Sequence, residues 1–355
     1  MQTDGHEIIS KFRPAKIILP VIIGLGVALY LFLKEFDREA YSKIDWTVYT
    51  TFWILLALVM MILRDVSYMY RIKVLSGNFI SWRRSFPVIM LWEFSSAVTP
   101  TMVGGTALAF FILNREGLRM GRSIAVVLTT SFLDEMFFVL AVPLVFLFVG
   151  KSNLFVSLDP SVASTVTSMG GMYYFFWMGY AVLLAYTLLV AYAIFVNPRA
   201  VKWLLLKFFS LPLLRKWRQQ AWQSGNDMIV ASGELRDQPR SYWIKSFGAT
   251  ILSWTARYMV INCIIMAFIT HGLHENIVIY ARQLVMWIIM LVSPTPGASG
   301  IAEVIFSRFL SEFTPAGVDA SIALLWRLIS YYPYLFIGVI ILPRWVRRNV
   351  ITRSK

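Results

Sequence analysis

The sequence predicts an all-α, polytopic membrane protein with about six full spans and two broken, re-entrant hairpins arranged as an inverted repeat. The first of three observations is composition: 58% of the 355 residues are hydrophobic, 15% are charged and the mean hydropathy is +0.66. A soluble domain cannot bury so much apolar surface. The second is that proline and glycine interrupt two apolar stretches, and the third is that basic residues collect in a few loops. We expect one transmembrane domain over residues 1–355.

The net charge of +14 comes largely from Lys and Arg in a few loops and in the C-terminal tail. This pattern is typical of cytoplasmic loops beside anionic lipid, so it predicts a membrane partner and not nucleic acid. The first apolar run, 17–33, follows a basic segment and is longer than the core of a signal peptide, so we interpret it as a retained span. Both termini are expected in the cytoplasm, in an inner (cytoplasmic) membrane. Cys263 is the single cysteine, which excludes an intrachain disulfide.

The first half of the repeat is expected over residues 46–149. A span over about 46–63 should end where Arg64 begins a basic stretch. The apolar segment 86–113 is interrupted by Pro100 and by Gly104 and Gly105, and both its ends look cytoplasmic. Two halves of about 12 residues reach about 18 Å each, enough to enter the membrane and return. A full span over about 122–149 then crosses outward.

A span over about 172–196 returns to the cytoplasm, where residues 197–243 form a basic loop. Aromatic residues alternate with the charges in this loop, which favours an amphipathic helix on the inner leaflet. The second half, 244–343, repeats the pattern. It has a span over 244–270, a broken stretch over 280–310 entered from outside, and a last span over 321–343.

The two breaks can be superimposed by one offset. Thr99-Pro100-Thr101 falls on Ser293-Pro294-Thr295, and Gly104-Gly105-Thr106 falls on Ala298-Ser299-Gly300. The predicted topology gives the two halves opposite orientations. Inverted repeats with discontinuous helices are typical of secondary transporters, whose substrate lies near the midplane between the repeats.

A helix restarts after each break, so two helix N-termini should meet near mid-membrane. Free backbone N–H groups with hydroxyls around them can bind an anion such as a phosphodiester head group. The alternative is that the hydroxyls only satisfy the broken backbone. The expected substrate-binding residues at the breaks are Thr99, Thr101, Gly104, Gly105, Ser293, Thr295, Gly297 and Gly300.

Arg257 falls near the middle of a span, where a charge is costly unless it is paired or hydrated. It could bind a lipid phosphate through two hydrogen bonds, or it could be a structural partner of a buried carboxylate. Arg327 is a second candidate because the repeat offset places it close to Asp134. By default Arg64, Arg282 and Arg308 are interpreted as snorkelling anchors near helix ends.

Four carboxylates are candidates for proton coupling or counter-charge. Asp134 and Glu135 are adjacent in a span, so they should point about 100° apart, one toward the cavity and one toward a neighbouring helix. The alternative is a buried ion pair that fixes helix packing. Glu303 and Glu93 lie in the broken hairpins, where a carboxylate could also cap a half-helix.

The stretch Pro294-Thr-Pro-Gly-Ala-Ser-Gly-Ile-Ala-Glu303 resembles the proline–glycine–glutamate signature of the lysylphosphatidylglycerol synthase transmembrane family. This family is the flippase-like membrane part of the multiple peptide resistance factors. The stretch from Pro100 to Gly105 is similar to its first-half counterpart. The chain departs from the family at Ala298, where glycine is common, and at Ala302, where a basic residue is common. It also lacks the acidic residue that often follows the first-half glycine. The resemblance implies lipid translocation and not lysyl transfer.

The sequence therefore predicts a flippase or lipid transporter that moves an anionic phospholipid or a polyprenyl-linked lipid through a polar midplane cavity. Two alternatives stay open: an intramembrane lipid-modifying enzyme, and a membrane scaffold for a lipid synthase. The expected partners are membrane lipids, with a homo-oligomer or a lipid-synthase partner also possible. We expect no cofactor and no metal site, because His271, His274 and Glu275 are a weak pattern for a metal.

Overall fold

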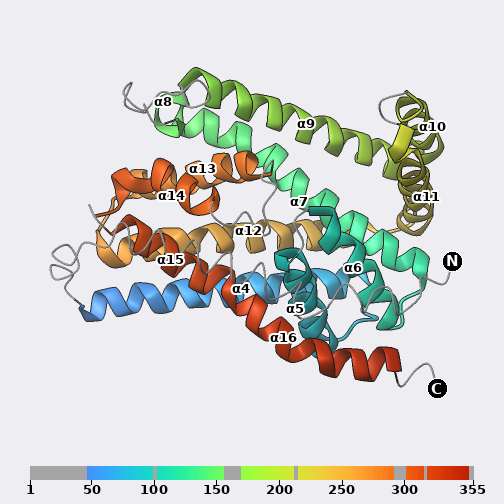
Figure 1. Ribbon diagram of the computed structural model, residues 1–355, viewed down its shortest axis with the longest axis horizontal. Helices are drawn as coiled ribbons and strands as arrows, with labels where there is room; N and C mark the ends of the chain where they lie inside the picture. The colour runs from blue at the N-terminus through green and yellow to red at the C-terminus, as the bar shows by residue number, and fades with distance from the viewer. Residues whose placement is uncertain are drawn as a thin grey trace.

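The computed structural model describes residues 46–98, 102–155, 169–211, 215–291, 301–315 and 318–351. Over these ranges the chain is all-helical (Figure 1). Five helical stretches are long and apolar enough to cross a membrane: Val48–Leu75, Met120–Val149, Phe176–Phe195, Arg240–Phe268 and Ile322–Asn349. They correspond to the five later spans expected from the sequence, whereas the first expected span, 17–33, lies outside the described residues.

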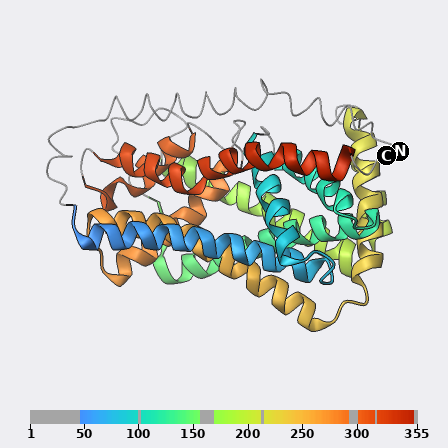
Figure 2. The same cartoon turned by 90° about the horizontal axis from the view of Figure 1, so that it is seen from below.

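Two long helices, α4 (Val48–Leu75) and α12 (Arg240–Phe268), lie side by side along the bundle (Figure 2). The Thr47 side chain caps α4 by accepting a hydrogen bond from the Thr50 N–H. The expectation that this span ends near residue 63 was wrong, because α4 continues to Leu75. Arg64 and Arg71, the first two arginines of the basic stretch, are buried and paired with Glu93 and Asp134 of other helices, so their charges do not end the helix.

A second layer consists of α7 (Met120–Val149) and α9 (Met169–Phe195), joined at one end of the bundle through the short α8 (Lys151–Leu154). At the other end α10 (Pro198–Phe208) and α11 (Arg218–Leu235) pack together and lie across the ends of α7 and α9 (Figure 1). Asn197 caps α10 through a hydrogen bond from the Ala200 N–H. A single 3-10 turn, Arg215–Trp217, precedes α11.

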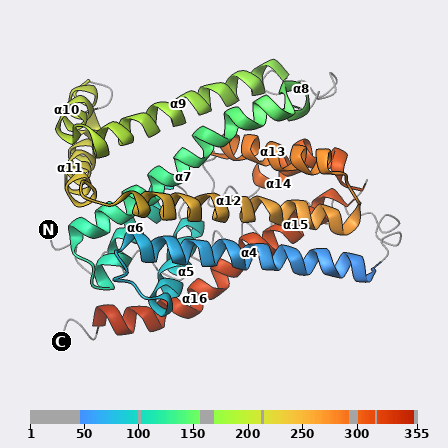
Figure 3. The ribbon, with the colours of Figure 1, turned by 180° about the vertical axis from the view of Figure 1, so that it is seen from behind.

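Both apolar stretches that carry proline and glycine are built as pairs of short helices. The first pair is α5 (Trp82–Val98) and α6 (Met102–Arg115), and the second is α13 (Leu273–Met290) and α14 (Ile301–Leu310). Residues 99–101 and 292–300 at the two breaks lie outside the described residues. Figures 1 and 3 show α5 and α6 in the half of the bundle nearer α10 and α11, with α13 and α14 in the opposite half.

The helix α13 begins at Leu273, earlier than the expected residue 280. The Asn276 side chain donates to the carbonyls of His271 and Gly272, which stabilises this early start. After α14 a short 3-10 turn, Ser311–Phe313, leads to the last span.

The last span is divided into α15 (Asp319–Ser330) and α16 (Tyr332–Val346), followed by a π-turn over Arg347–Ile351. The expected last span, 321–343, is present as Ile322–Asn349, but the interruption inside it was not expected. The break falls at Tyr331, whose φ of −129° and ψ of −55° are not helical. Pro333 follows and has no N–H to donate to the preceding turn, which explains a helix restart at this point.

Two packing contacts position the centre of the bundle. The helix α5 packs against α16, and α13 packs against α7. In the second contact the Phe138 ring stacks on the Trp287 ring, with 3.5 Å between ring centroids and 3° between ring planes. Both contacts border the charged residues described next.

Candidate functional site

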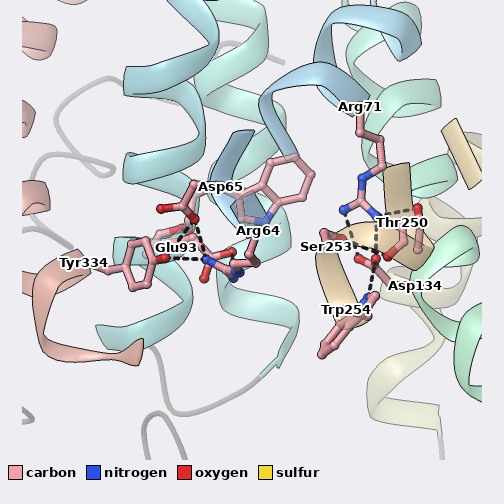
Figure 4. A network of polar contacts seen from close by, with 11 residues as sticks. Arg64, Asp65, Arg71, Glu93, Asp134, Thr250, Ser253, Trp254 and Tyr334 are labelled. Atoms are coloured by element: carbon pink, nitrogen blue, oxygen red, sulfur yellow. Dashed lines mark hydrogen bonds and ion pairs between the residues drawn. The ribbon is translucent and has the colours of Figure 1, made fainter. Parts of the chain in front are cut away.

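Arg64, in the middle of α4, has no exposed surface and is surrounded by acidic and phenolic groups. Its Nη1 donates to Asp65 Oδ1 at 2.9 Å and to the Tyr334 hydroxyl at 2.7 Å, and its Nη2 forms an ion pair with Glu93 Oε1 at 2.7 Å. The Tyr334 hydroxyl in turn donates to Asp65 Oδ1 at 2.8 Å. One guanidinium therefore connects α4, α5 and α16 (Figure 4).

Arg71, two turns further along α4, is 3% exposed and binds Asp134 of α7 through both carboxylate oxygens. The Nη1–Oδ1 distance is 2.5 Å and the Nη2–Oδ2 distance is 3.2 Å. Two groups of α12 complete the arrangement: Thr250 Oγ1 accepts from Arg71 Nη1 at 2.9 Å, and Trp254 Nε1 donates to Asp134 Oδ1 at 2.8 Å. A bidentate, charge-assisted pair of this kind fixes geometry as well as charge.

The ring of Tyr68 connects the two arginines. It lies 4.5 Å from the Arg64 guanidinium carbon and 4.6 Å from that of Arg71. An aromatic face attracts a cation, most strongly where water is excluded, and Tyr68 is itself only 6% exposed. Arg64, Tyr68 and Arg71 are four and three residues apart, so they lie on one face of α4.

Arg257 of α12 differs from these two arginines. It is half-buried, its guanidinium carbon lies 5.4 Å from the centre of the Trp254 ring, and it makes no ion pair in the part of the chain that the structure describes. Its charge still acts on the Glu93 carboxylate, after the stronger interaction of Glu93 with Arg64. Arg257 is therefore the least paired of the three arginines on α4 and α12 among the described residues, and its role as a ligand for a lipid phosphate stays a prediction.

The two adjacent carboxylates of α7 point to different helices. Asp134 faces α4 and α12, whereas Glu135 faces Thr187 of α9. The Glu135 Oε2 atom is buried and has no hydrogen-bond partner among the described residues. The two neighbours point to different helices, as their spacing on α7 predicted, and the partner of Asp134 is Arg71 and not Arg257 or Arg327. Their roles in proton coupling or counter-charge stay a prediction.

Two of the three arginines expected to snorkel, Arg64 and Arg282, are buried, so that expectation was wrong for them. Arg64 is described above. Arg282 of α13 is 3% exposed; it donates to the carbonyls of Asn153 and Phe309 and forms an ion pair with Glu312 at 2.6 Å. Arg327 of α15 is 5% exposed and lies 3.9 Å above the Tyr331 ring. Arg308 is intermediate in exposure.

Most of the expected substrate-binding residues at the breaks lie outside the described residues: Thr99, Thr101, Ser293, Thr295, Gly297 and Gly300. Gly104 and Gly105 lie in the first turn of α6, and Glu303 lies in the first turn of α14. The predicted anion site at the two helix N-termini therefore stays a prediction. What the structure brings together is the row of charges between α4, α5, α7, α12 and α16.

The sequence reasoning missed Arg71, Asp65 and Tyr68. A signal was present, because the residues at 64, 68 and 71 share one helical face. Their charges were read as the end of the span. The sequence does not show that Glu93, 29 positions after Arg64, and Asp134, 63 positions after Arg71, pack against that face.

Comparison with known proteins agrees with this architecture. The family described as "Lysylphosphatidylglycerol synthase TM region" matches residues 17–338. The chain belongs to this lysylphosphatidylglycerol synthase transmembrane family. A UPF0104 membrane protein from Archaeoglobus fulgidus is 27% identical over 347 residues, covering 91% of this chain and 95% of that protein. No solved structure matches the sequence significantly. Membership of the family confirms the resemblance seen at Pro294–Glu303 and is consistent with a multi-pass membrane protein.

Proposed function

We propose that this member of the lysylphosphatidylglycerol synthase transmembrane family is a lipid transporter that binds the phosphate of an anionic lipid at the buried arginines. The observation that carries the proposal is the set of three arginines, Arg64, Arg71 and Arg257, on the two adjacent helices α4 and α12. A charge inside the membrane is expensive and usually marks a substrate or ion pathway. Guanidinium groups suit a phosphate because they present parallel N–H donors.

Arg257 is the proposed first contact. It is half-buried and makes no ion pair among the described residues, so a phosphate can bind it without displacing a carboxylate. Arg64 and Arg71 are held by Glu93 and Asp134, and an arriving phosphate would compete with these carboxylates. Exchange of partners is the proposed means by which binding of the head group shifts the positions of α5 and α7 relative to α4.

The helix arrangement supports an inverted repeat. The order α4, α5 with α6, α7 is followed again by α12, α13 with α14, α15 with α16. In this repeat α5 corresponds to α13, and α7 corresponds to α15 with α16. The contact of α5 with α16 in one half therefore has its counterpart in the contact of α13 with α7, and both contacts are present. The two short-helix pairs also lie in opposite halves of the bundle, as two re-entrant hairpins entered from opposite sides would (Figure 3). Such an arrangement suits alternating access around a central site.

The distribution of charge supports an orientation in a cell membrane. Basic residues of α10 and α11 and those after α16 lie at the same end of the bundle (Figure 1). The positive-inside rule assigns this end to the cytoplasm. The C-terminus would then be cytoplasmic, and α8 and the turn over Ser311–Phe313 would lie on the outer side.

The test uses purified full-length protein in liposomes with fluorescently labelled phosphatidylglycerol in both leaflets. Dithionite bleaches only outer-leaflet dye, so translocation appears as bleaching beyond one half. We expect Arg257→Ala to abolish this extra bleaching, and Arg199→Ala, an exposed arginine of α10, to leave it unchanged. Labelled phosphatidylcholine, which has no net charge, should move more slowly than phosphatidylglycerol.

The possible outcomes distinguish transport from the two alternative functions. Wild-type protein that bleaches no more than empty liposomes would overturn the transport proposal. A new lipid product seen by mass spectrometry would favour a lipid-modifying enzyme, and activity gained only with a lipid synthase present would favour a scaffold. Transport that survives Arg257→Ala would remove this residue from the mechanism.

A further inference from the structure

The charges at the centre of the bundle balance before any ligand arrives. Three arginines, Arg64, Arg71 and Arg257, face three carboxylates, Asp65, Glu93 and Asp134. A lipid phosphodiester adds one negative charge to this neutral set. In a low-dielectric interior that extra charge is costly unless a proton enters with it. Binding of the phosphate therefore requires a route by which a proton can reach these buried groups.

A row of hydroxyl groups leads from one end of the bundle to the Arg71–Asp134 pair. On α12 the hydroxyl residues Tyr242, Ser246 and Thr250 follow at intervals of four, so they lie on one face. On α7 Thr130 lies one turn before Asp134 on the same face. Every one of these hydroxyl residues is at most 6% exposed. The row therefore lies inside the contact of α12 with α7, away from lipid.

Two hydroxyl groups of the row, Ser246 Oγ and Thr130 Oγ1, are buried without a hydrogen-bond partner in the part of the chain that the structure describes. The Tyr242 hydroxyl meets the hydroxyl of Thr129 on α7. Buried polar groups are nearly always hydrogen-bonded, either to protein or to ordered water. Residues four apart on a helix are about 6 Å apart along its axis, a gap that one water molecule bridges. The row thus has the spacing of a hydrated path.

Both ends of the row are connected. At its inner end Thr250 Oγ1 accepts from Arg71 Nη1 at 2.9 Å and donates to the Ser246 carbonyl at 2.9 Å, so the hydroxyl nearest Asp134 that stays available for water is Thr130, one turn before it on α7. At its outer end the Tyr242 ring lies under the guanidinium of Arg122, at 5.9 Å, and Arg122 pairs with Glu234 at 3.7 Å. The Glu234 side chain is 39% exposed, so the path begins at a carboxylate in contact with solvent.

We infer that this hydroxyl row is a hydrated path that carries protons between the α11 end of the bundle and Asp134. The inference rests on the proposed function for its purpose, and the proposed topology places the entrance in the cytoplasm. A proton arriving along the path binds Asp134 Oδ2 and breaks the O⁻···H–N⁺ pair with Arg71. The Arg71 guanidinium keeps its charge and binds the lipid phosphate instead, and the proton leaves when the phosphate is released.

The surroundings of Asp134 fit this exchange. From α4 it faces Arg71 and, further off, Tyr68; from α12 it faces Trp254; and its neighbour on α7, Glu135, points away toward α9. Arg71 is the cation that a proton would displace. Because Trp254 can donate to either a charged or a neutral carboxyl, it holds Asp134 in place in both states.

The direct test detects water and does not depend on lipid transport. Brief X-ray radiolysis of the full-length protein in detergent generates hydroxyl radicals from water, including bound water, and mass spectrometry then locates the modified side chains. We expect Tyr242 to be modified several-fold faster than the fully buried Phe138 of the aromatic cluster. Ser246→Val and Thr130→Val replace hydroxyls of the path with methyl groups and should cause a several-fold loss of Tyr242 modification.

Ala249→Val is the matched control, because Ala249 is buried on the same helix at 6% exposure and carries no hydroxyl. It should leave Tyr242 modification unchanged. If Tyr242 of the wild-type protein is modified no faster than Phe138, the inference is wrong, and this comparison does not require any variant to fold. Equal loss in Ser246→Val and Ala249→Val would also overturn it, since the effect would then be general packing damage.

A second measurement tests proton movement in liposomes that contain a pH-sensitive dye. With phosphatidylglycerol translocating, an imposed pH difference should change the initial rate in wild type, and Thr130→Val should lose that response. The two proposals fail separately. If Tyr242 is modified by radiolysis but no lipid is transported, the transport proposal is wrong and the water path is retained. If lipid is transported but Tyr242 is not modified and the rate does not respond to pH, the water path is wrong and the transport proposal is retained.

Discussion

Arg71 of α4 and Asp134 of α7 form a bidentate ion pair, with Nη1–Oδ1 at 2.5 Å and Nη2–Oδ2 at 3.2 Å, inside the helical bundle. The two residues are 63 positions apart in the chain. Their pairing, with Trp254 and Thr250 of α12, joins three membrane-spanning helices at one point. The pair is therefore a structural joint of the bundle, and it is also the point where the proposed function has an anionic ligand exchange with a carboxylate.

Removing one partner of this pair should destabilise the protein strongly. Arg71→Met leaves Asp134 as a buried charge without its cation, which costs about 3–5 kcal/mol of unfolding free energy. Replacing both groups, as Arg71→Met with Asp134→Leu, should recover most of that loss because no unpaired charge remains. Unfolding in detergent, followed by intrinsic fluorescence, measures both. A double variant no more stable than Arg71→Met would show that the ion pair is not the cause of the loss.

The two adjacent carboxylates of α7 should respond in opposite ways to the same change. Glu135→Gln replaces a buried carboxyl group that has no cationic partner among the described residues, so we expect stability to stay the same or to rise. Asp134→Asn removes the ionic partner of Arg71 and should lower stability by about 3 kcal/mol. The two variants are isosteric with the wild type and control for each other. Similar thermal shifts in both would contradict the assignment of Asp134 to the network and Glu135 to the α9 side.

The membrane class and the five later spans could be predicted from the sequence because apolar length is a local signal, whereas the two breaks, at residues 99–101 and 292–300, lie outside the described residues and stay a prediction. The extension of α4 could not be predicted. A charge in an apolar run indicates a helix end unless a partner is known, and the partners Glu93 and Asp134 come from distant segments. The interruption of the last span at Tyr331 was also missed, because Pro333 lies inside a long apolar run and the hydropathy of that run predicts an unbroken helix.

The candidate site was predicted in part. Arg257, Asp134 and Glu93 were identified from their unfavourable position inside apolar segments, and the structure places them close to one another. The partner of each could not be derived, since a repeat offset relates equivalent positions and not contacting ones. For this reason Arg327 was expected beside Asp134, whereas Arg71 binds it.

A buried carboxylate outside the central network fixes the end of the last helix. One oxygen of Glu116, Oε1, accepts from Trp345 Nε1 at 2.7 Å, from Arg348 Nη2 at 2.7 Å and from Asn349 Nδ2 at 3.0 Å. Glu116→Ala leaves these donors without their acceptor, at a cost of about 1–3 kcal/mol. We expect faster trypsin cleavage after Arg348. Glu234→Ala, which removes a more exposed ion pair, is the control and should leave the cleavage rate unchanged.

The contact of α16 with α5 depends on a glycine. A Cβ atom added at Gly338 would overlap the ring of Phe94, a side chain with no exposed surface, so the two helices could not keep their separation. Gly338→Ala should therefore cost about 1–3 kcal/mol, the usual cost of overpacking. Gly248→Ala on α12 is the matched control, because a Cβ there meets nothing within 4 Å. Adding Phe94→Leu to Gly338→Ala should restore part of the stability, since the smaller side chain leaves room for the methyl group. Alanine favours a helix more than glycine does, so the control should be at least as stable as the wild type. An equal fall in melting temperature in both glycine variants would contradict the role of this contact.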